Sequence, residues 1–310
     1  MSPDRTAARL LRLYPPSWRR RYGGELETLI LDMSGGGRVP WRIRADVAAT
    51  GGRERLRAAG LGGDSPDARV RGGASLVLWA WALFVVAGAI VQKTSEHWQQ
   101  ALPAGSHIAT TVAFASLIGV AVAAGVLVVA GIALTLPALT RCVGAGGWAQ
   151  IRRPVTRAVA ITAGFVVATA GLVAWAHGLS PRDRQGHDTA YALLATVWAL
   201  FGAGTLGAWT LAATRTAARL TLPASLLRVE ARLATAVTAT LGVMAAVTAV
   251  WWVSVATVAP PALTGSLGSR GSAFVPQLVL AMVLMLAALG LAGAGARRAT
   301  RALPHLAGDD

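Results

Sequence analysis

The sequence predicts an all-α fold: a polytopic membrane helix bundle with about six transmembrane helices and a small helical cytoplasmic N-terminal segment. Two observations lead to this prediction. The 310 residues are 54% hydrophobic and only 14% charged, with a mean hydropathy of +0.53, and a water-soluble domain of this size could not hide so much apolar surface. Long apolar stretches also alternate with connections that carry almost all the arginines.

The transmembrane helices are predicted from six long apolar stretches. A bilayer core about 30 Å thick needs about 20 mainly apolar helical residues, because unpaired backbone groups are costly in hydrocarbon. None of the six stretches contains Asp, Glu, Lys or Arg. The second lies within a longer apolar run, which should tilt or project beyond the bilayer. The predicted spans are approximately 74–91, 109–133, 158–179, 191–213, 233–258 and 277–296.

The distribution of basic residues predicts the orientation of these helices. Of 29 basic residues, 28 are Arg and only Lys93 is Lys, which suggests a high-GC bacterial genome. With the N-terminus placed inside, 25 of them lie in cytoplasmic segments and 4 lie on the other side. Cytoplasmic loops carry the excess of Lys and Arg. We therefore expect a multi-pass protein of the bacterial inner membrane with both termini in the cytoplasm.

Aromatic and small residues suggest how the helices are anchored and packed. Trp251 and Trp252 are expected at the outer membrane boundary, where Trp is enriched. The helices are rich in Ala, Gly and Thr, which permits close approach and interhelical hydrogen bonds. Gly290 and Ala294 form one small-residue pair in the sixth span. Packing within one bundle is the main interpretation of such pairs, and homo-oligomerisation through them is the alternative.

Residues 1–62 differ in kind from the bundle and are predicted to form a cytoplasmic helical segment. A short amphipathic helix should stop at Pro15 and Pro16, and Ser17 is expected to cap a second helix. Three glycines beginning at Gly35 should end that helix. A third helix is predicted at roughly 41–59, with a weak point at Gly51 and Gly52. A linker (63–73), the transmembrane domain (74–296) and a cytoplasmic tail (297–310) complete the chain.

One stretch of the N-terminal segment, LLRLYPPSWRRRYGGEL from Leu10 to Leu26, resembles the permease prefix of certain bacterial permease-like proteins. The shared pattern is a leucine-rich start, Tyr-Pro, an aromatic residue, Arg-x-Arg-Tyr-Gly and an acidic residue. The match does not reach the membrane domain, which lacks the large extracytoplasmic domain of the macrolide-exporter type. The resemblance implies an adaptor or stability module without catalytic residues. Its candidate partner-docking or membrane-surface residues are Tyr14, Trp18, Arg19, Arg20, Arg21, Tyr22 and Glu25.

Charge gives a physical reason to place this segment at the membrane. Up to the first predicted span there are 14 Arg and 8 acidic residues. Each basic group near anionic lipid contributes on the order of 1 kcal/mol, so the segment is expected to lie against the anionic inner leaflet. No helix-turn-helix spacing is present, so nucleic acid is not an expected partner.

Known catalytic and cofactor motifs are missing from the sequence. A Walker A loop needs a Gly-rich turn before Lys, and Lys93 lacks it. Cys142 is the only cysteine, which rules out an intrachain disulfide. The predicted spans contain no ionisable residue for a proton relay. Several His and acidic residues on the outer side match no metal-ligand spacing and are interpreted as solvated loop residues: His97, His107, His177, His187, Glu96, Asp183 and Asp188.

These observations lead to a first functional hypothesis and an alternative, and neither includes catalysis, a cofactor or a metal. The first is a permease-like membrane component that works with a separate ATPase, docked through a short coupling helix at 221–232. The alternative is a membrane-anchored regulatory or scaffold protein that binds a cytoplasmic partner through its N-terminal segment. A membrane enzyme that uses the outer His and Asp residues is the least favoured hypothesis.

Overall fold

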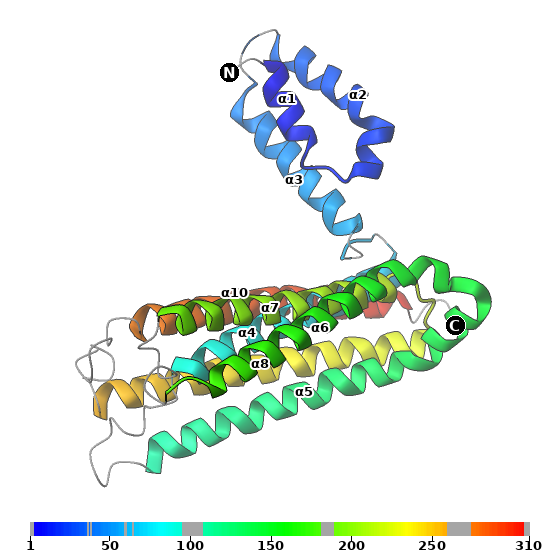
Figure 1. The fold of residues 1–310 in the computed structure, drawn as a ribbon. Helices are drawn as coiled ribbons and strands as arrows, with labels where there is room; N and C mark the ends of the chain where they lie inside the picture. The colour runs from blue at the N-terminus through cyan, green and yellow to red at the C-terminus, as the bar shows by residue number, and fades with distance from the viewer. Residues whose placement is uncertain are drawn as a thin grey trace.

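The fold is known from a computed structural model that describes residues 3–35, 37, 39–58, 61–63, 65–94, 108–180, 189–258 and 274–306. Within these ranges every regular element is a helix, and six helices are long and apolar enough to cross a membrane. Three shorter helices precede them (Figure 1). The predicted all-α multi-pass bundle is therefore confirmed.

The three N-terminal helices are α1 (Pro3–Leu11), α2 (Pro16–Ser34) and α3 (Trp41–Ala58). The predicted cap at Ser17 is wrong, because Pro15 is the N-cap of α2 and Ser17 lies inside the helix. Pro16 occupies the first helical position. Proline suits this position, because the N–H that it lacks would have no intrahelical acceptor there. Helix α2 ends as predicted at Gly35, which has φ 55° and donates its N–H to Asp32 O.

The six long helices extend beyond the predicted spans. The extra turns lie mostly at the ends that carry arginine, where polar side chains can leave the hydrocarbon. The first long helix already begins at Pro66, so the connection before the bundle is shorter than predicted. The bounds are α4 (Pro66–Thr94), α5 (Ile108–Cys142), α6 (Trp148–His177), α7 (Thr189–Ala217), α8 (Ala224–Val258) and α10 (Phe274–Ala302).

Helix α4 begins and α10 ends at the same end of the bundle (Figure 1). Arg298 of α10 donates hydrogen bonds there to Leu61 O (3.0 Å) and Gly63 O (3.2 Å). The short turn Val143–Gly147, which kinks at Gly146 (φ 82°), joins α5 to α6 at this end. We call it the arginine-rich end, because it carries Arg69, Arg71, Arg141, Arg152, Arg153, Arg157, Arg215, Arg219, Arg228, Arg232, Arg297, Arg298 and Arg301.

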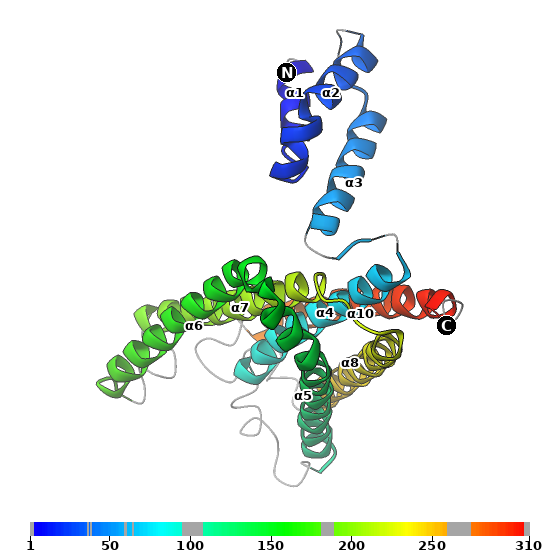
Figure 2. The ribbon, with the colours of Figure 1, turned by 90° about the vertical axis from the view of Figure 1, so that its right-hand side faces the viewer.

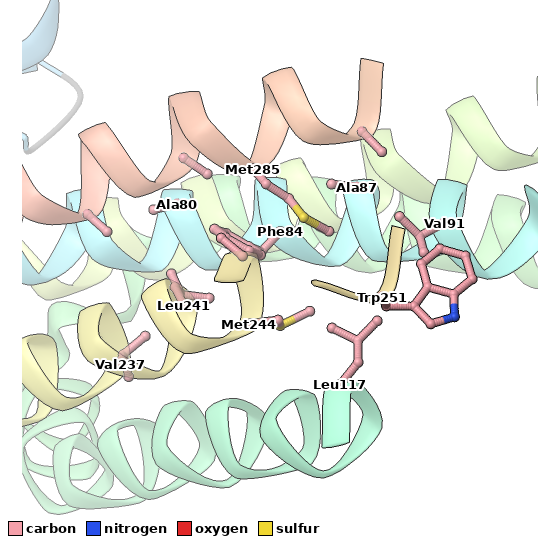
Figure 3. Close-up of a cluster of buried hydrophobic side chains, with 14 of the residues drawn as sticks. Ala80, Phe84, Ala87, Val91, Leu117, Val237, Leu241, Met244, Trp251 and Met285 are labelled. Atoms are coloured by element: carbon pink, nitrogen blue, oxygen red, sulfur yellow. The ribbon is translucent and has the colours of Figure 1, made fainter. Parts of the chain in front are cut away.

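The core of the bundle lies between α4, α8 and α10, with α5 packed against α8 (Figure 3). Phe84, Leu241 and Met285 are among its fully buried side chains. Trp251 was expected as an interfacial anchor, but it is fully buried and packs against Phe114, with ring centroids 5.9 Å apart. Its position on α8 faces the neighbouring helices rather than the lipid.

Helices α4 and α10 approach each other closely where they cross. Gly73 and Gly295 lie backbone to backbone, and a Cβ on Gly73 would be 2.5 Å from Gly295 O. Gly290, which was singled out in the sequence, meets nothing within 4 Å. The small residue that brings these helices together is thus Gly295.

Helices α6 and α7 form a peripheral hairpin that projects from the core (Figure 2). Trp198 and Trp209 of α7 each donate an indole hydrogen bond, 2.8 Å long, to the hydroxyls of Thr169 and Thr162 on α6. These are the interhelical hydrogen bonds that the Thr content predicts. Most large apolar side chains on the pair are exposed, including Val167 at 71%. Such a surface requires lipid around it.

Candidate functional site

Helices α1, α2 and α3, which we call the N-terminal unit, have a small core of their own. Two of the predicted docking residues, Tyr14 and Trp18, belong to this core. Tyr14 is only 2% exposed, and its ring stacks on Trp18 at a centroid distance of 4.1 Å. Burial raises the pKa of the Tyr14 hydroxyl, and Asp46 and Glu54 raise it further. Tyr14 and Trp18 therefore hold the unit together. The buried residues of this core are Ala7, Leu10, Tyr14, Ile30, Val39 and Val47.

Helix α3 closes the unit through a glycine and an arginine. A Cβ on Gly51 would lie 3.0 Å from Leu13 Cβ and 3.1 Å from the Tyr14 ring, so the helix can approach this closely only because Gly51 lacks a side chain. Arg55 donates its Nε–H to Leu13 O at 2.6 Å and a second N–H to Arg12 O. Helix α3 is therefore continuous through the predicted weak point at Gly51 and Gly52. Gly51 is the residue through which α3 contacts Tyr14.

One face of α2 exposes a row of large apolar side chains. Tyr22, Leu29 and Met33 are 42%, 53% and 56% exposed. Their spacing of seven and four residues places them on one side of the helix. We call these three residues the α2 apolar stripe. The other exposed residues among those predicted for docking are Arg19, Arg20, Arg21 and Glu25, and the Arg21 guanidinium carbon lies 5.9 Å from the centre of the Tyr22 ring.

Leu29 and Met33 are not among the docking residues predicted from the sequence, although they lie on the same apolar face of α2 as Tyr22. That face is wider than the surface that the rest of the unit covers. Ile30 is buried, whereas Leu29 and Met33 remain exposed. The sequence does contain a sign of this exposure, because the apolar face of α2 is too wide for the rest of the unit to cover.

A second feature is a cavity of about 640 Å³ in the bundle. It lies mainly between α4, α5, α7 and α8, near the arginine-rich end of the bundle, and the first turns of α6 and the connection between α7 and α8 also contribute to its lining. Its wall is mainly aliphatic and aromatic. Residues that define the wall include Leu78, Trp81, Leu134, Trp209, Leu226 and Leu233.

Among the described residues that line this cavity, Glu230 of α8 is the only ionisable one. Its Oε2 atom is buried, and none of the described residues is its hydrogen-bond partner. Arg71 lies near enough to act on it electrostatically, but Arg71 donates its hydrogen bonds to Leu220 O and Asp67 O. Sequence reasoning missed Glu230. The available signal was its isolation, because no other acidic residue occurs between Asp188 and Asp309.

Of the outer-side His and acidic residues, which the sequence indicates to be solvated loop residues, only His177 lies within the described part of the chain. His97, His107, His187, Glu96, Asp183 and Asp188 fall outside the described residues. His177 is exposed, and its Nδ1 lies 2.8 Å from Val173 O. The part of the chain that the structure describes contains no group of three or more His, Cys, Asp or Glu residues that could hold a metal ion.

The expected separate coupling helix is also wrong. Residues from Ala224 onward are the first turns of the continuous helix α8. Leu227 is buried against Val70 of α4 and Ala299 of α10. This segment belongs to the bundle because its apolar face fills the space between those two helices.

The chain matches no protein-family model, no curated protein and no solved structure.

Proposed function

We propose that this protein is a membrane-anchored regulatory or scaffold protein without enzymatic activity. Its N-terminal unit binds a cytoplasmic protein, and its six helices hold that unit at the bacterial inner membrane. The α2 apolar stripe carries the proposal, because Leu29 and Met33 are more than half exposed on a unit that already has its own core. A contiguous exposed apolar patch on a helical unit in water marks an interaction site.

Charges beside the stripe favour a protein partner over the membrane surface. Glu25 and Asp32 lie four residues before and three residues after Leu29, so both flank it on the helix surface. Both are exposed. Carboxylates at this border would be repelled by anionic lipid. A protein with an apolar helix face or groove and basic residues at its rim fits the stripe better.

Photocrosslinking in native membranes tests this proposal with the full-length chain. A photoreactive amino acid at Leu29 should link the chain to one cytoplasmic protein. The same amino acid at Arg20, which is exposed on the opposite side of α2, should not. The double substitution Leu29→Ser and Met33→Ser should abolish co-purification of that protein. Crosslinks from Leu29 to lipid alone, or equal crosslinking from both positions, would overturn the proposal.

A permease-like component that works with a separate ATPase is the second candidate, and the bundle cavity is the observation that favours it. Its volume of about 640 Å³ suits a small-molecule substrate. An ATPase would have to dock without a coupling helix at 221–232, and the turn Val143–Gly147 is the other short helical connection at that end. Stoichiometric co-purification with an ATPase that hydrolyses ATP faster in the presence of the full chain would support this candidate.

A further inference from the structure

We infer that the bundle cavity binds an amphipathic organic cation, with its apolar body between α4, α5, α7 and α8 and its cationic group at Glu230. This site is distinct from the N-terminal stripe and does not depend on the proposed adaptor function.

The size and wall of the cavity define the body of the ligand. A volume of about 640 Å³ lies within the range of pockets that hold drug-sized molecules, about 300–1,000 Å³. Leu78 and Trp81 of α4 face it from one side, and Leu134 of α5 and Leu233 of α8 contribute to the remaining wall. Such a surface favours aromatic or aliphatic groups over a hydrated polar molecule.

The polar atoms of the wall define the charge of the ligand. Thr210 and Thr214 donate their hydroxyl hydrogens to Leu206 O (2.8 Å) and Leu211 O (3.0 Å) of their own helix. Their hydrogen-bond donors are therefore already used. Glu230 differs, because its Oε2 is buried without a partner.

An unpaired carboxylate oxygen in apolar surroundings is costly, and the described residues do not supply its partner. No ion pair to Glu230 forms among them. Arg71 directs its guanidinium to the carbonyls of Leu220 and Asp67. An anionic ligand would meet the Glu230 carboxylate, and a neutral hydrocarbon chain would leave Oε2 with only the electrostatic action of Arg71 and no direct partner. A ligand with an apolar body and a cationic group would contact the apolar wall and also be attracted to the Glu230 carboxylate.

Equilibrium dialysis of the purified full chain in lipid nanodiscs tests the inference with two probes of the same shape and opposite charge. Tetraphenylphosphonium should bind saturably at one site per chain, above the background of empty nanodiscs. Tetraphenylborate should show no saturable binding. Glu230→Gln should weaken tetraphenylphosphonium binding about tenfold or more, because it removes the charge–charge attraction between the phosphonium and the carboxylate.

A second pair of variants separates loss of the site from loss of the fold. Ala213→Phe places a ring in the cavity from α7 and should abolish binding although Glu230 is intact. Val167→Phe makes a comparable change on the exposed lipid face of α6 and should leave binding unchanged. Saturable binding that survives Glu230→Gln or Ala213→Phe, or equal binding of both probes, would overturn the inference.

Discussion

The substitution Gly73→Ala tests the structure at the crossing of α4 and α10. The added Cβ would lie 2.5 Å from Gly295 O and 2.9 Å from Ala299 N. Cβ contacts below 3.0 Å are essentially never observed in proteins. Because both neighbours are backbone atoms, no side-chain rotation can relieve the contact. The two helices must separate.

The size of the required movement gives the expected loss of stability. The contact with Gly295 O must lengthen from 2.5 Å to at least the 3.4 Å of ordinary van der Waals contact. Overpacking of this kind costs about 1–3 kcal/mol. Replacing Gly by Ala in a helix returns up to about 1 kcal/mol. After a return of about 1 kcal/mol, we expect Gly73→Ala to lower the free energy of unfolding by up to about 2 kcal/mol, and by about 1–3 kcal/mol relative to a Gly→Ala control without the close contact.

Thermal unfolding of the full chain in detergent, followed by tryptophan fluorescence, measures this loss. Gly290→Ala on α10 is the matched control, because its Cβ meets nothing within 4 Å. Gly88→Ala on α4 is a second control, with Met244 Cε at 3.9 Å as its only contact. If Gly73→Ala unfolds at the same temperature as the two controls, the close α4–α10 crossing is incorrect.

Two further predictions concern the N-terminal unit and the orientation of the bundle. Gly51→Ala should increase cleavage of the unit by trypsin in the full chain, because the Cβ meets the Tyr14 ring. Gly52→Ala has open space and should not; equal cleavage of the two variants would contradict the contact between Gly51 and Tyr14. For orientation, Arg219→Cys in a Cys142→Ser background should react with an impermeant maleimide only after cells are permeabilised. His177→Cys should react in intact cells, and the opposite pattern would invert the topology.

The six spans were predictable because the bilayer imposes a length and excludes charge. Helix ends were less so, since α8 begins at Ala224, nine residues before the charge-free stretch. Packing partners were not predictable either. Gly290 and Gly295 are both small residues on α10, but only the latter meets Gly73 at the crossing. Trp251 sits near a helix end, and whether it faces lipid or core depends on neighbours distant in sequence.

The candidate docking surface was partly predictable. The N-terminal motif pointed to Tyr22 and the exposed arginines, and Tyr22 is part of the α2 apolar stripe. Tyr14 and Trp18 share the same motif but pack inside the unit. A sequence motif cannot distinguish an aromatic residue that stabilises a small core from one that binds a partner, because both are apolar and regularly spaced.

The exposed fraction of an apolar side chain has to be interpreted differently in the helix bundle and in the N-terminal unit. Val167 is 71% exposed, yet this has little significance because lipid replaces water around α6. Met33 is 56% exposed on a unit outside the membrane-spanning helices, where exposed apolar surface costs about 25 cal/mol per Å². Met33 is therefore the more informative residue.

Polar atoms follow the reverse rule. An exposed arginine of the N-terminal unit is fully hydrated and needs no explanation. The unpartnered Oε2 of Glu230 is buried in the apolar cavity near the arginine-rich end of the bundle, where a missing hydrogen bond is costly. Each half therefore shows one departure from the rule of its own surroundings: the α2 apolar stripe outside the membrane-spanning helices, and the Glu230 carboxylate in the apolar cavity.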